Sequence, residues 1–221
     1  MIIKFCGLTN LPDALAAADL GADMLGFNFY PISPRCISTQ LCTSMVSEIR
    51  QNHPKIRFVG VFVDMESAAI QTILDQCNLD LAQLCGNEPP SALIKLGARG
   101  FKAIRPANLD ALRSALGIFP RPPAPPALLI DAYRPGEFGG TGQTADWILA
   151  ANLSRQLPIL LAGGLTPENV HQAVQQVHPW GVDVASGIEK SPGIKDFQKM
   201  KAFIQAAKIV HQENSHDNNF T

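Results

Sequence analysis

The sequence predicts a (β/α)8 barrel that forms a single domain over residues 1–208, and three observations support this. Short β-rich segments alternate with longer helical patterns from one end of the chain to the other. Eight such units recur at a spacing of roughly two dozen residues, as in compact barrels. Strict alternation implies parallel strands joined by right-handed crossovers. A doubly wound open sheet is the alternative, but its first turn normally carries GxGxxG, which is absent after residues 2–6.

The individual elements follow from the same pattern. We expect strands at residues 2–6, 23–29, 56–63, 79–85, 100–105, 127–132, 158–164 and 182–186. We expect helices near residues 11–20, 39–51, 66–77, 89–97, 108–116, 143–154, 167–177 and 195–208. Thr9 or Asn10 can cap the first helix, and the segment 166–168 can open the seventh.

Two segments depart from the alternation. The tract FPRPPAPPA (119–127) is rich in proline, which cannot extend a helix, so we predict a stiff loop that enters the sixth strand. Residues 209–221 are polar and lack a periodic apolar face, which predicts a disordered tail.

Composition narrows the classes of function. A formal net charge of −1 gives no electrostatic reason to expect nucleic acid or an anionic membrane as a partner. The apolar runs are too short to span a bilayer, and no secretory signal is visible at the N-terminus. The five cysteines have no CxxC pair and no zinc-like spacing, which predicts free thiols in a cytoplasmic protein and no metal site.

Reactive side chains are expected where the strands end. In barrels of this type the active site is built at the C-terminal ends of the strands and on the loops that follow. Cys6 ends the first strand, Arg35 lies in the loop after the second, and Asp131 ends the sixth. From position alone, Cys6 could equally be a small packing residue.

Glycine clusters predict a phosphate site. They follow the sixth, seventh and eighth strands, at residues 139–142, at Gly163 and Gly164, and at Ser186 and Gly187. Small residues let backbone N–H groups approach an anion closely, and a short helix beginning near residue 186 would add its positive end. The ends of strands seven and eight are the usual phosphate site of such barrels.

Strand alternation places a charged residue beneath Cys6. Because side chains on one face of a strand repeat every second residue, Lys4 should point the same way as Cys6, one layer deeper. A buried lysine needs a partner, and Asp183 on the neighbouring eighth strand is a candidate.

Seven motifs then occur in order, and together they resemble the phosphoribosylanthranilate isomerase family of tryptophan biosynthesis. They are KFCGLT, GFNFYPISPR, GVFVD, QLCGNE, DAYRPGEFGGTGQTADW, LAGGLTPENV and GVDVASGIEKSPGIKD. The resemblance covers residues 2–208 apart from the proline-rich tract. It implies an aldose–ketose isomerase with a (β/α)8 fold, which converts N-(5-phosphoribosyl)anthranilate to 1-(2-carboxyphenylamino)-1-deoxyribulose 5-phosphate by an Amadori rearrangement.

The resemblance also implies the roles of particular residues. Cys6 would be the general base and Asp131 the general acid, while Arg35 would hold the anthranilate carboxylate. The phosphate would lie against Gly163, Gly164, Ser186 and Gly187, and residues 134–142 would form a mobile lid. No cofactor or metal is implied. The expected partner is the small phosphosugar–anthranilate substrate, with neither nucleic acid nor membrane, and the chain would be a monomer or homodimer.

These roles carry physical demands. A cysteine is mostly a thiol at neutral pH, so Cys6 needs strand-end amides or a helix terminus to favour its thiolate. Asp131 must keep a proton to donate, which predicts an apolar or anion-rich environment. One departure from the family is Cys85, which stands where the motif QLHGDE has histidine. We expect activity to survive this change.

Rival functions remain open on the sequence alone. The related isomerase of histidine biosynthesis has aspartate where Cys6 stands and needs a second phosphate site. An epimerase of ribulose phosphate would need metal-binding histidines at strand ends, where the sequence places none. A catalytically silent barrel that only binds a phosphosugar is a further alternative, although Cys6, Arg35 and Asp131 together argue against it.

Overall fold

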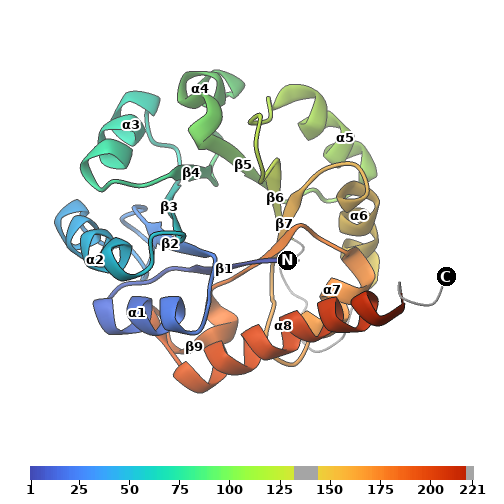
Figure 1. Cartoon of the computed structure of the whole chain (residues 1–221). Coiled ribbons are helices and arrows are strands. Elements are labelled where there is room, and N and C mark those ends of the chain that lie inside the picture. Colours follow the sequence, from blue (N-terminus) through green and yellow to red (C-terminus); the bar gives the residue numbers. More distant parts are fainter. Residues whose placement is uncertain (132–143, 218–221) are drawn as a thin grey trace.

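The structure, a computed structural model, describes the backbone of residues 1–131 and 144–217, and side chains within these ranges except at 144–146 and 210–217. The eight expected strands close into a barrel in which each strand is parallel to its neighbours and β1 pairs with β8. Figure 1 shows the strands at the centre and the helices around them. The strands are β1 (Ile2–Cys6), β2 (Met24–Asn28), β3 (Arg57–Phe62), β4 (Leu81–Leu84), β5 (Gly100–Ile104), β6 (Leu128–Asp131), β7 (Ile159–Ala162) and β8 (Gly181–Val184).

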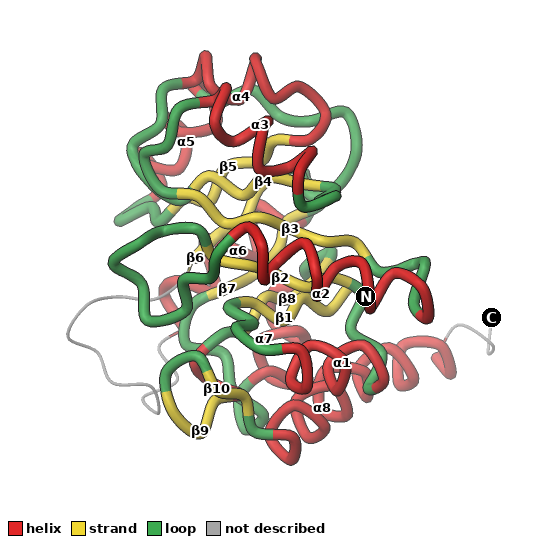
Figure 2. Tube along the Cα trace, turned by 90° about the vertical axis from the view of Figure 1, so that its left-hand side faces the viewer, coloured by secondary structure: helices red, strands yellow, loops and turns green. Residues whose placement is uncertain are grey.

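The helices form the outer layer. Figure 2 shows them flanking the strands along the length of the barrel. They are α1 (Leu11–Asp19), α2 (Thr39–Asn52), α3 (Ser67–Gln76), α4 (Pro90–Leu96), α5 (Leu109–Ile118), α6 (Thr144–Ser154), α7 (Val170–Val177) and α8 (Phe197–Asp217). The Asn10 side chain caps α1 by accepting a hydrogen bond of 2.9 Å from the Asp13 N–H, which resolves the choice between Thr9 and Asn10.

The fold prediction is confirmed, with three local differences. Helix α7 begins at Val170, because residues 167–169 form a turn in which the Asn169 side chain accepts from the Thr166 N–H. The expected helix near residue 186 is a three-residue 3-10 turn, η2 (Ser186–Ile188), followed by a hairpin of β9 (Glu189–Ser191) and β10 (Ile194–Lys195). A 3-10 turn, η1 (Gly97–Arg99), also precedes β5.

The C-terminal helix is longer than the sequence pattern indicated. Helix α8 runs to Asp217, so residues 209–217 belong to its backbone instead of the separate disordered tail we expected. This segment contains neither glycine nor proline, so no residue in it forces the helix to stop. The proline-rich tract 119–127 lies between α5 and β6 as a connection without regular structure, as predicted.

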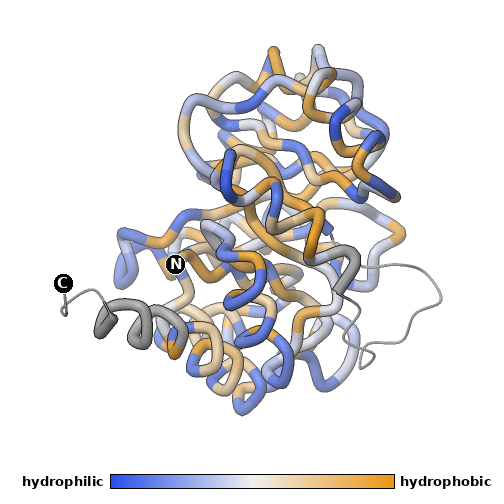
Figure 3. The backbone as a smooth tube through the Cα atoms, turned by 90° about the vertical axis from the view of Figure 1, so that its right-hand side faces the viewer, coloured by the Kyte–Doolittle hydropathy of each residue, from blue (hydrophilic) through white to orange (hydrophobic). Residues whose placement is uncertain are grey.

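Two hydrophobic layers hold the barrel together. The larger fills the space between strands and helices, and α7 contributes Val170, Ala173, Val174 and Val177 to it. Figure 3 shows hydrophobic and hydrophilic residues alternating along the helices, as expected when one face is buried. The smaller layer fills the barrel interior and consists of Met24, Val59, Leu81, Phe101, Leu129, Leu160 and Ala162. Side chains two residues further along the same strands therefore face the C-terminal mouth of the barrel.

No helix among the described residues is long and apolar enough to cross a membrane.

Candidate active site

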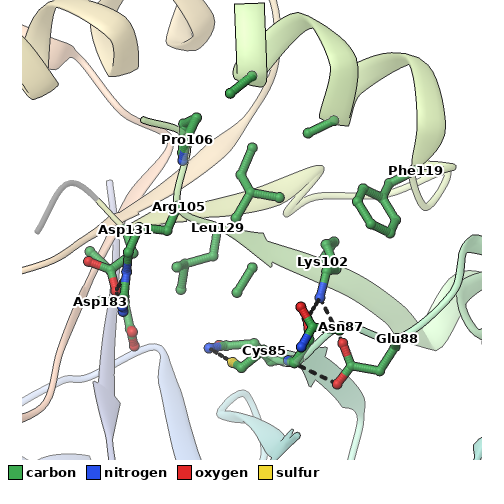
Figure 4. Close-up of a pocket in the computed structure, with 17 residues that line it drawn as sticks. Cys85, Asn87, Glu88, Lys102, Arg105, Pro106, Phe119, Leu129, Asp131 and Asp183 are labelled. Atoms are coloured by element: carbon green, nitrogen blue, oxygen red, sulfur yellow. Dashed lines mark hydrogen bonds and ion pairs between the residues drawn. The ribbon is translucent and has the colours of Figure 1, made fainter. Parts of the chain in front are cut away.

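A cavity of about 610 Å³ opens at the C-terminal ends of the strands, the face where barrel enzymes carry their chemistry. Figure 4 shows Asp131 and Asp183 on one side of it, Lys102 and Glu88 on the other, and Cys85 between them. Its lining residues are Gln83, Cys85, Gly86, Asn87, Glu88, Lys102, Ala103, Ile104, Arg105, Pro106, Ala111, Ala115, Phe119, Leu129, Asp131, Ala162 and Asp183.

Cys6 lies in the barrel interior above a buried ion pair. The Lys4 ammonium donates to Asp183 at 2.6 Å, which confirms the predicted pairing across β1 and β8. Lys4 is fully buried, whereas the Cys6 residue is 9% exposed. A Cβ atom added at Gly26 would lie 2.9 Å from the Cys6 sulfur and 3.2 Å from the Lys4 nitrogen. Both atoms thus converge on one small space that glycine leaves open.

The Lys4–Asp183 pair acts on the protonation of Cys6. Burial raises the pKa of the Cys6 thiol, the Lys4 charge opposes that rise, and the Asp183 charge adds to it, so the pKa stays above its ordinary value. Burial also works against the charge on Lys4, but Asp183 and Cys6 outweigh it and raise the Lys4 pKa, so the ammonium stays charged. The cation that favours the thiolate is therefore a lysine within the barrel, a source that the sequence analysis did not predict beside strand-end amides or a helix terminus.

Arg35 is held by a second buried network. Its Nε and Nη2 groups donate to the two carboxylate oxygens of Glu189 at 2.8 and 2.6 Å. The same carboxylate accepts from Lys195 at 2.8 Å, and Lys195 also donates to the carbonyl oxygen of Cys6 at 2.6 Å. Glu189 thus joins the loop after β2 to the hairpin after β8 and to the end of β1.

One carboxylate in this network faces two cations. Burial alone would raise the pKa of Glu189, but hydrogen bonds and charges from Arg35 and Lys195 outweigh it and lower the pKa. Burial lowers the pKa of Lys195 despite the opposing effect of Glu189. With Arg35 protonated and Glu189 ionised, a charged Lys195 leaves the cluster with an excess positive charge.

Asp131 has an environment opposite to the one expected. It ends β6 at the cavity wall, and the Arg105 side chain donates to its Oδ2 atom from both Nε, at 3.1 Å, and Nη2. The prediction of an apolar or anion-rich environment is therefore wrong for the described residues. The physical reason is that β5 and β6 are neighbours, so the residue after β5 reaches the end of β6. The Arg105 side chain is 59% exposed.

The residues predicted for phosphate binding lie together at the ends of β7 and β8. Gly163 and Gly164 have φ angles of 95° and 64°, a conformation that favours glycine. A Cβ atom at Gly187 would overlap the carbonyl oxygen of Leu165, so the two strand ends touch through backbone. Ser186 is exposed beside them. The cluster 139–142 and the expected lid at 134–142 lie outside the described residues.

A third buried pair supports the far side of the cavity. Lys102 on β5 donates to Glu88 at 2.7 Å and to the carbonyl oxygen of Gly86 at 2.5 Å. Glu88 in turn accepts from the N–H groups of Asp64 and Gly86. Burial alone would raise the pKa of Glu88, but these hydrogen bonds lower it. The segment that carries Cys85 is thereby fixed.

The predicted residues do not all share one cavity in the described part of the chain. Asp131 lines the cavity, while Cys6, Arg35 and the four phosphate-site residues are absent from its described lining. Cys6 is connected to it through Lys4 and Asp183. The site residues that sequence reasoning missed are Gln83, Glu88, Lys102, Arg105, Glu189 and Lys195. Period-two alternation on β4 gives Gln83, since it lies two residues beyond the inward-facing Leu81.

Among the described residues, no three His, Cys, Asp or Glu side chains come together in a group that could hold a metal ion. The chemistry that the described side chains themselves offer is acid–base chemistry and anion binding. Buried groups with shifted pKa values at the C-terminal mouth of a (β/α)8 barrel define the class of protein: a barrel enzyme acting on a small anionic substrate.

Comparisons with known proteins specify the class further. The family model for N-(5'-phosphoribosyl)anthranilate isomerase matches residues 3–206. The isomerase of that name from Chlorobium luteolum is 44% identical over 215 residues, which cover 94% of this chain and 97% of the relative. The one from Pelobacter propionicus is 41% identical over 213 residues, covering 96% and 98%.

Comparisons with solved structures point to the same family. The phosphoribosylanthranilate isomerase of Thermotoga maritima superposes with a TM-score of 0.82 at 38% identity, covering 94% of this chain and 99% of the other. A second structure, of such an isomerase in complex with reduced 1-(o-carboxyphenylamino)-1-deoxyribulose 5-phosphate, gives a TM-score of 0.80 at 36% identity, with the same coverage. The chain belongs to the N-(5'-phosphoribosyl)anthranilate isomerase family.

The function follows from this membership. The chain is an isomerase that acts on N-(5-phosphoribosyl)anthranilate in tryptophan biosynthesis. The comparisons give no support to the silent barrel or to the histidine-pathway isomerase.

Proposed function

We propose that the chain performs the Amadori rearrangement with Cys6 as general base and Asp131 as general acid. Asp131 protonates the ribose ring oxygen, which opens the ring to a Schiff base. Cys6 then removes the proton at C2, and the resulting enolamine tautomerises to the ketose. The observation that carries the proposal is the Lys4 ammonium, which converges with the Cys6 sulfur on the space beside Gly26, because a cation at this place favours the thiolate.

Cys6 suits the role of base because a cation lies beside a thiol that would otherwise hold its proton more tightly. Burial raises the pKa of Cys6, and the Lys4 charge offsets part of that rise. A general base is most effective when its pKa lies near the working pH. The backbone beneath Cys6 is also fixed, since its carbonyl oxygen accepts from Lys195.

Asp131 must deliver a proton to the ring oxygen, and in the described structure Arg105 donates hydrogen bonds to its Oδ2 atom. We propose that Arg105 turns away into solvent when substrate enters. Its side chain is more than half exposed, so this movement uncovers little buried surface. The substrate then takes the place of the Arg105 side chain beside Asp131, which brings the carboxyl group within reach of the ring oxygen.

Arg35 and the glycines at the ends of β7 and β8 are proposed to hold the two charged ends of the substrate. Glu189 uses two of the five N–H groups of Arg35, so the guanidinium has donors left for a carboxylate. The positive excess of the Arg35–Glu189–Lys195 cluster favours an anion. Gly163, Gly164, Ser186 and Gly187 offer backbone N–H groups to the phosphate.

We also propose the binding partners, the cellular location and the assembly of the protein. A net charge near zero favours a small-molecule substrate over nucleic acid or a membrane surface. The five cysteines, which are free thiols in the structure, suit the cytoplasm. The Thermotoga maritima relative has been described as dimeric, so a homodimer is one of the two assemblies we propose, beside a monomer.

A fluorescence assay of substrate consumption tests the proposal. We expect rapid turnover by the wild-type protein and a loss of about 10²- to 10⁴-fold with Asp131→Asn or Cys6→Ala, the usual worth of one acid or base. Circular dichroism would confirm that both variants are folded. Full activity in either folded variant would refute the role assigned to that residue.

A further inference from the structure

One polar group that faces the cavity has no role in the mechanism above. The Gln83 side chain is inside the barrel mouth, and the residue is 4% exposed. Among the described residues its carbonyl oxygen Oε1 is buried and has no hydrogen-bond partner. Most buried polar atoms in proteins are paired, because an unpaired acceptor costs about 1–3 kcal/mol. An unpaired buried acceptor at a cavity wall therefore indicates a place where a ligand donates a hydrogen bond.

The amide of Gln83 is fixed by its neighbours. Its Nε2 group donates to the Cys85 sulfur at 3.2 Å, which leaves Oε1 to face the cavity. Strand β4 pairs Gln83 with Val61 on one side and Phe101 on the other, and neither side chain has a donor. Among the described residues no donor pairs with Oε1, and a ligand that enters the cavity can supply one.

The position of Gln83 indicates which part of the substrate it meets. In the closed barrel, β4 lies across from β8, so Gln83 stands on the opposite side of the mouth from Asp183 and from the glycines proposed to bind phosphate. The carboxylate and phosphate of the substrate are acceptors and cannot donate to a carbonyl oxygen. The donors of the substrate are the hydroxyl groups of the sugar and the amine N–H that joins it to the aromatic ring.

We propose that Gln83 is a substrate-binding residue whose Oε1 atom accepts a hydrogen bond from the neutral middle of the substrate, a sugar hydroxyl or the amine N–H. Cys85 positions this amide. The inference rests on the proposed function, because it takes the substrate from there. It adds a contact that the whole substrate can make and that anthranilate or inorganic phosphate alone cannot make.

Binding of reduced 1-(o-carboxyphenylamino)-1-deoxyribulose 5-phosphate tests the proposal without turnover. Gln83→Met keeps the length of the side chain and removes the acceptor. We expect it to weaken the affinity for this compound about three- to tenfold, the worth of one neutral hydrogen bond. Affinity for anthranilate or inorganic phosphate alone should change less than about twofold, since neither contains the neutral middle. Gln71→Met is the matched control, because Gln71 is exposed and its amide bonds to the Lys95 carbonyl oxygen outside the cavity.

Thermal stability separates a binding role from a structural one. If Gln83 serves the ligand, Gln83→Met removes an unpaired buried acceptor and the free protein should unfold at the wild-type temperature or above it. A lower unfolding temperature with unchanged affinity would show a structural role and overturn the proposal.

A double-mutant cycle tests the role of Cys85. Cys85→Ala should weaken binding of the reduced product in the wild-type background and have no effect in Gln83→Met, because it acts through the amide. Equal effects in both backgrounds would overturn the positioning role.

The outcomes distinguish this proposal from the one on which it rests. If the wild-type protein binds the reduced product and Gln83→Met binds it equally well, the Gln83 proposal alone fails. A wild-type protein that does not bind the reduced product would overturn the proposed substrate and, with it, this inference.

Discussion

The two sides of the catalytic mouth are built differently. On the β1–β8 side, Cys6 rests on the buried Lys4–Asp183 pair, and Arg35 is clamped by the buried Glu189. On the β5–β6 side, Asp131 is paired with an arginine that is largely exposed. Buried pairs are rigid and weakly screened, whereas an exposed pair exchanges readily with solvent. In the proposed mechanism, this difference gives Cys6 a fixed support before substrate arrives, whereas the contact at Asp131 changes when substrate binds.

The largest expected effect comes from removing the base. Cys6→Ala should lower kcat by about 10²- to 10⁴-fold, the usual contribution of one general base. Cys36→Ala is the matched control, because Cys36 lies in the loop after β2 outside the cavity lining. Stopped-flow fluorescence on both variants makes the comparison, and a large loss with Cys36→Ala would contradict it.

The next largest effect is expected from removing the Glu189 carboxylate, which holds the Arg35 guanidinium in place. Glu189→Gln leaves Lys195 and Arg35 without their shared carboxylate, and breaking a buried pair costs about 3–5 kcal/mol. We expect KM to rise at least tenfold with a smaller change in kcat, because the guanidinium loses its orientation. Glu189→Asp keeps the charge and should lose less stability. A normal KM in folded Glu189→Gln would show that Arg35 needs no clamp.

Removing the charge beneath Cys6 should move the pH dependence of the reaction. Lys4 lowers the pKa of Cys6 by more than Asp183 raises it, so Lys4→Met with Asp183→Asn should leave the pKa of Cys6 higher than in the wild-type protein. The acid limb of kcat/KM then shifts to higher pH, and alkylation of Cys6 by iodoacetamide slows at neutral pH. The double variant leaves no uncompensated charge in the barrel. An unchanged acid limb would show that the pair is purely structural.

A smaller effect is expected on the acid side. Arg105→Met removes the side chain that donates hydrogen bonds to Asp131. Because substrate already displaces Arg105 in our account, kcat should change less than about threefold. Steady-state kinetics would measure this. A loss comparable with that of Asp131→Asn would mean that Arg105 takes part in the chemistry.

The smallest effect is on stability in acid. The pKa values of Glu88 and Glu189 are lowered in the folded protein. Each carboxylate therefore stabilises the fold at a pH above its unfolded pKa of about 4.3. That stability is lost as the pH falls through the folded pKa. Urea unfolding between pH 6 and pH 3 should therefore show falling stability, beginning near that unfolded value. A Glu88→Gln, Lys102→Met double variant should lose stability less steeply. Equal slopes would argue against a contribution from the Glu88 pair.

The sequence predicted the barrel well because period-two and helical patterns depend on local residues. It also predicted the Lys4–Asp183 pair, since alternation and strand order together fix which side chains meet inside a barrel. It failed for Arg105 and Asp131, because the direction of a side chain beyond a strand end follows no period. Glu189 lay within a recognised motif, yet its hold on Arg35 spans 154 positions and only the closed fold brings the two together.

Kinetic isotope effects test most directly whether Asp131 acts as the acid and Cys6 as the base. With substrate deuterated at C2 of the ribosyl group, we would measure kcat/KM for the wild-type protein, Asp131→Asn and Cys6→Ser. Without the acid, ring opening should limit the rate, and the isotope effect should fall towards one in Asp131→Asn. With a weak base, removal of the C2 proton should limit the rate, and the effect should rise in Cys6→Ser. A large isotope effect in Asp131→Asn with a small one in Cys6→Ser would contradict the roles assigned to the two residues.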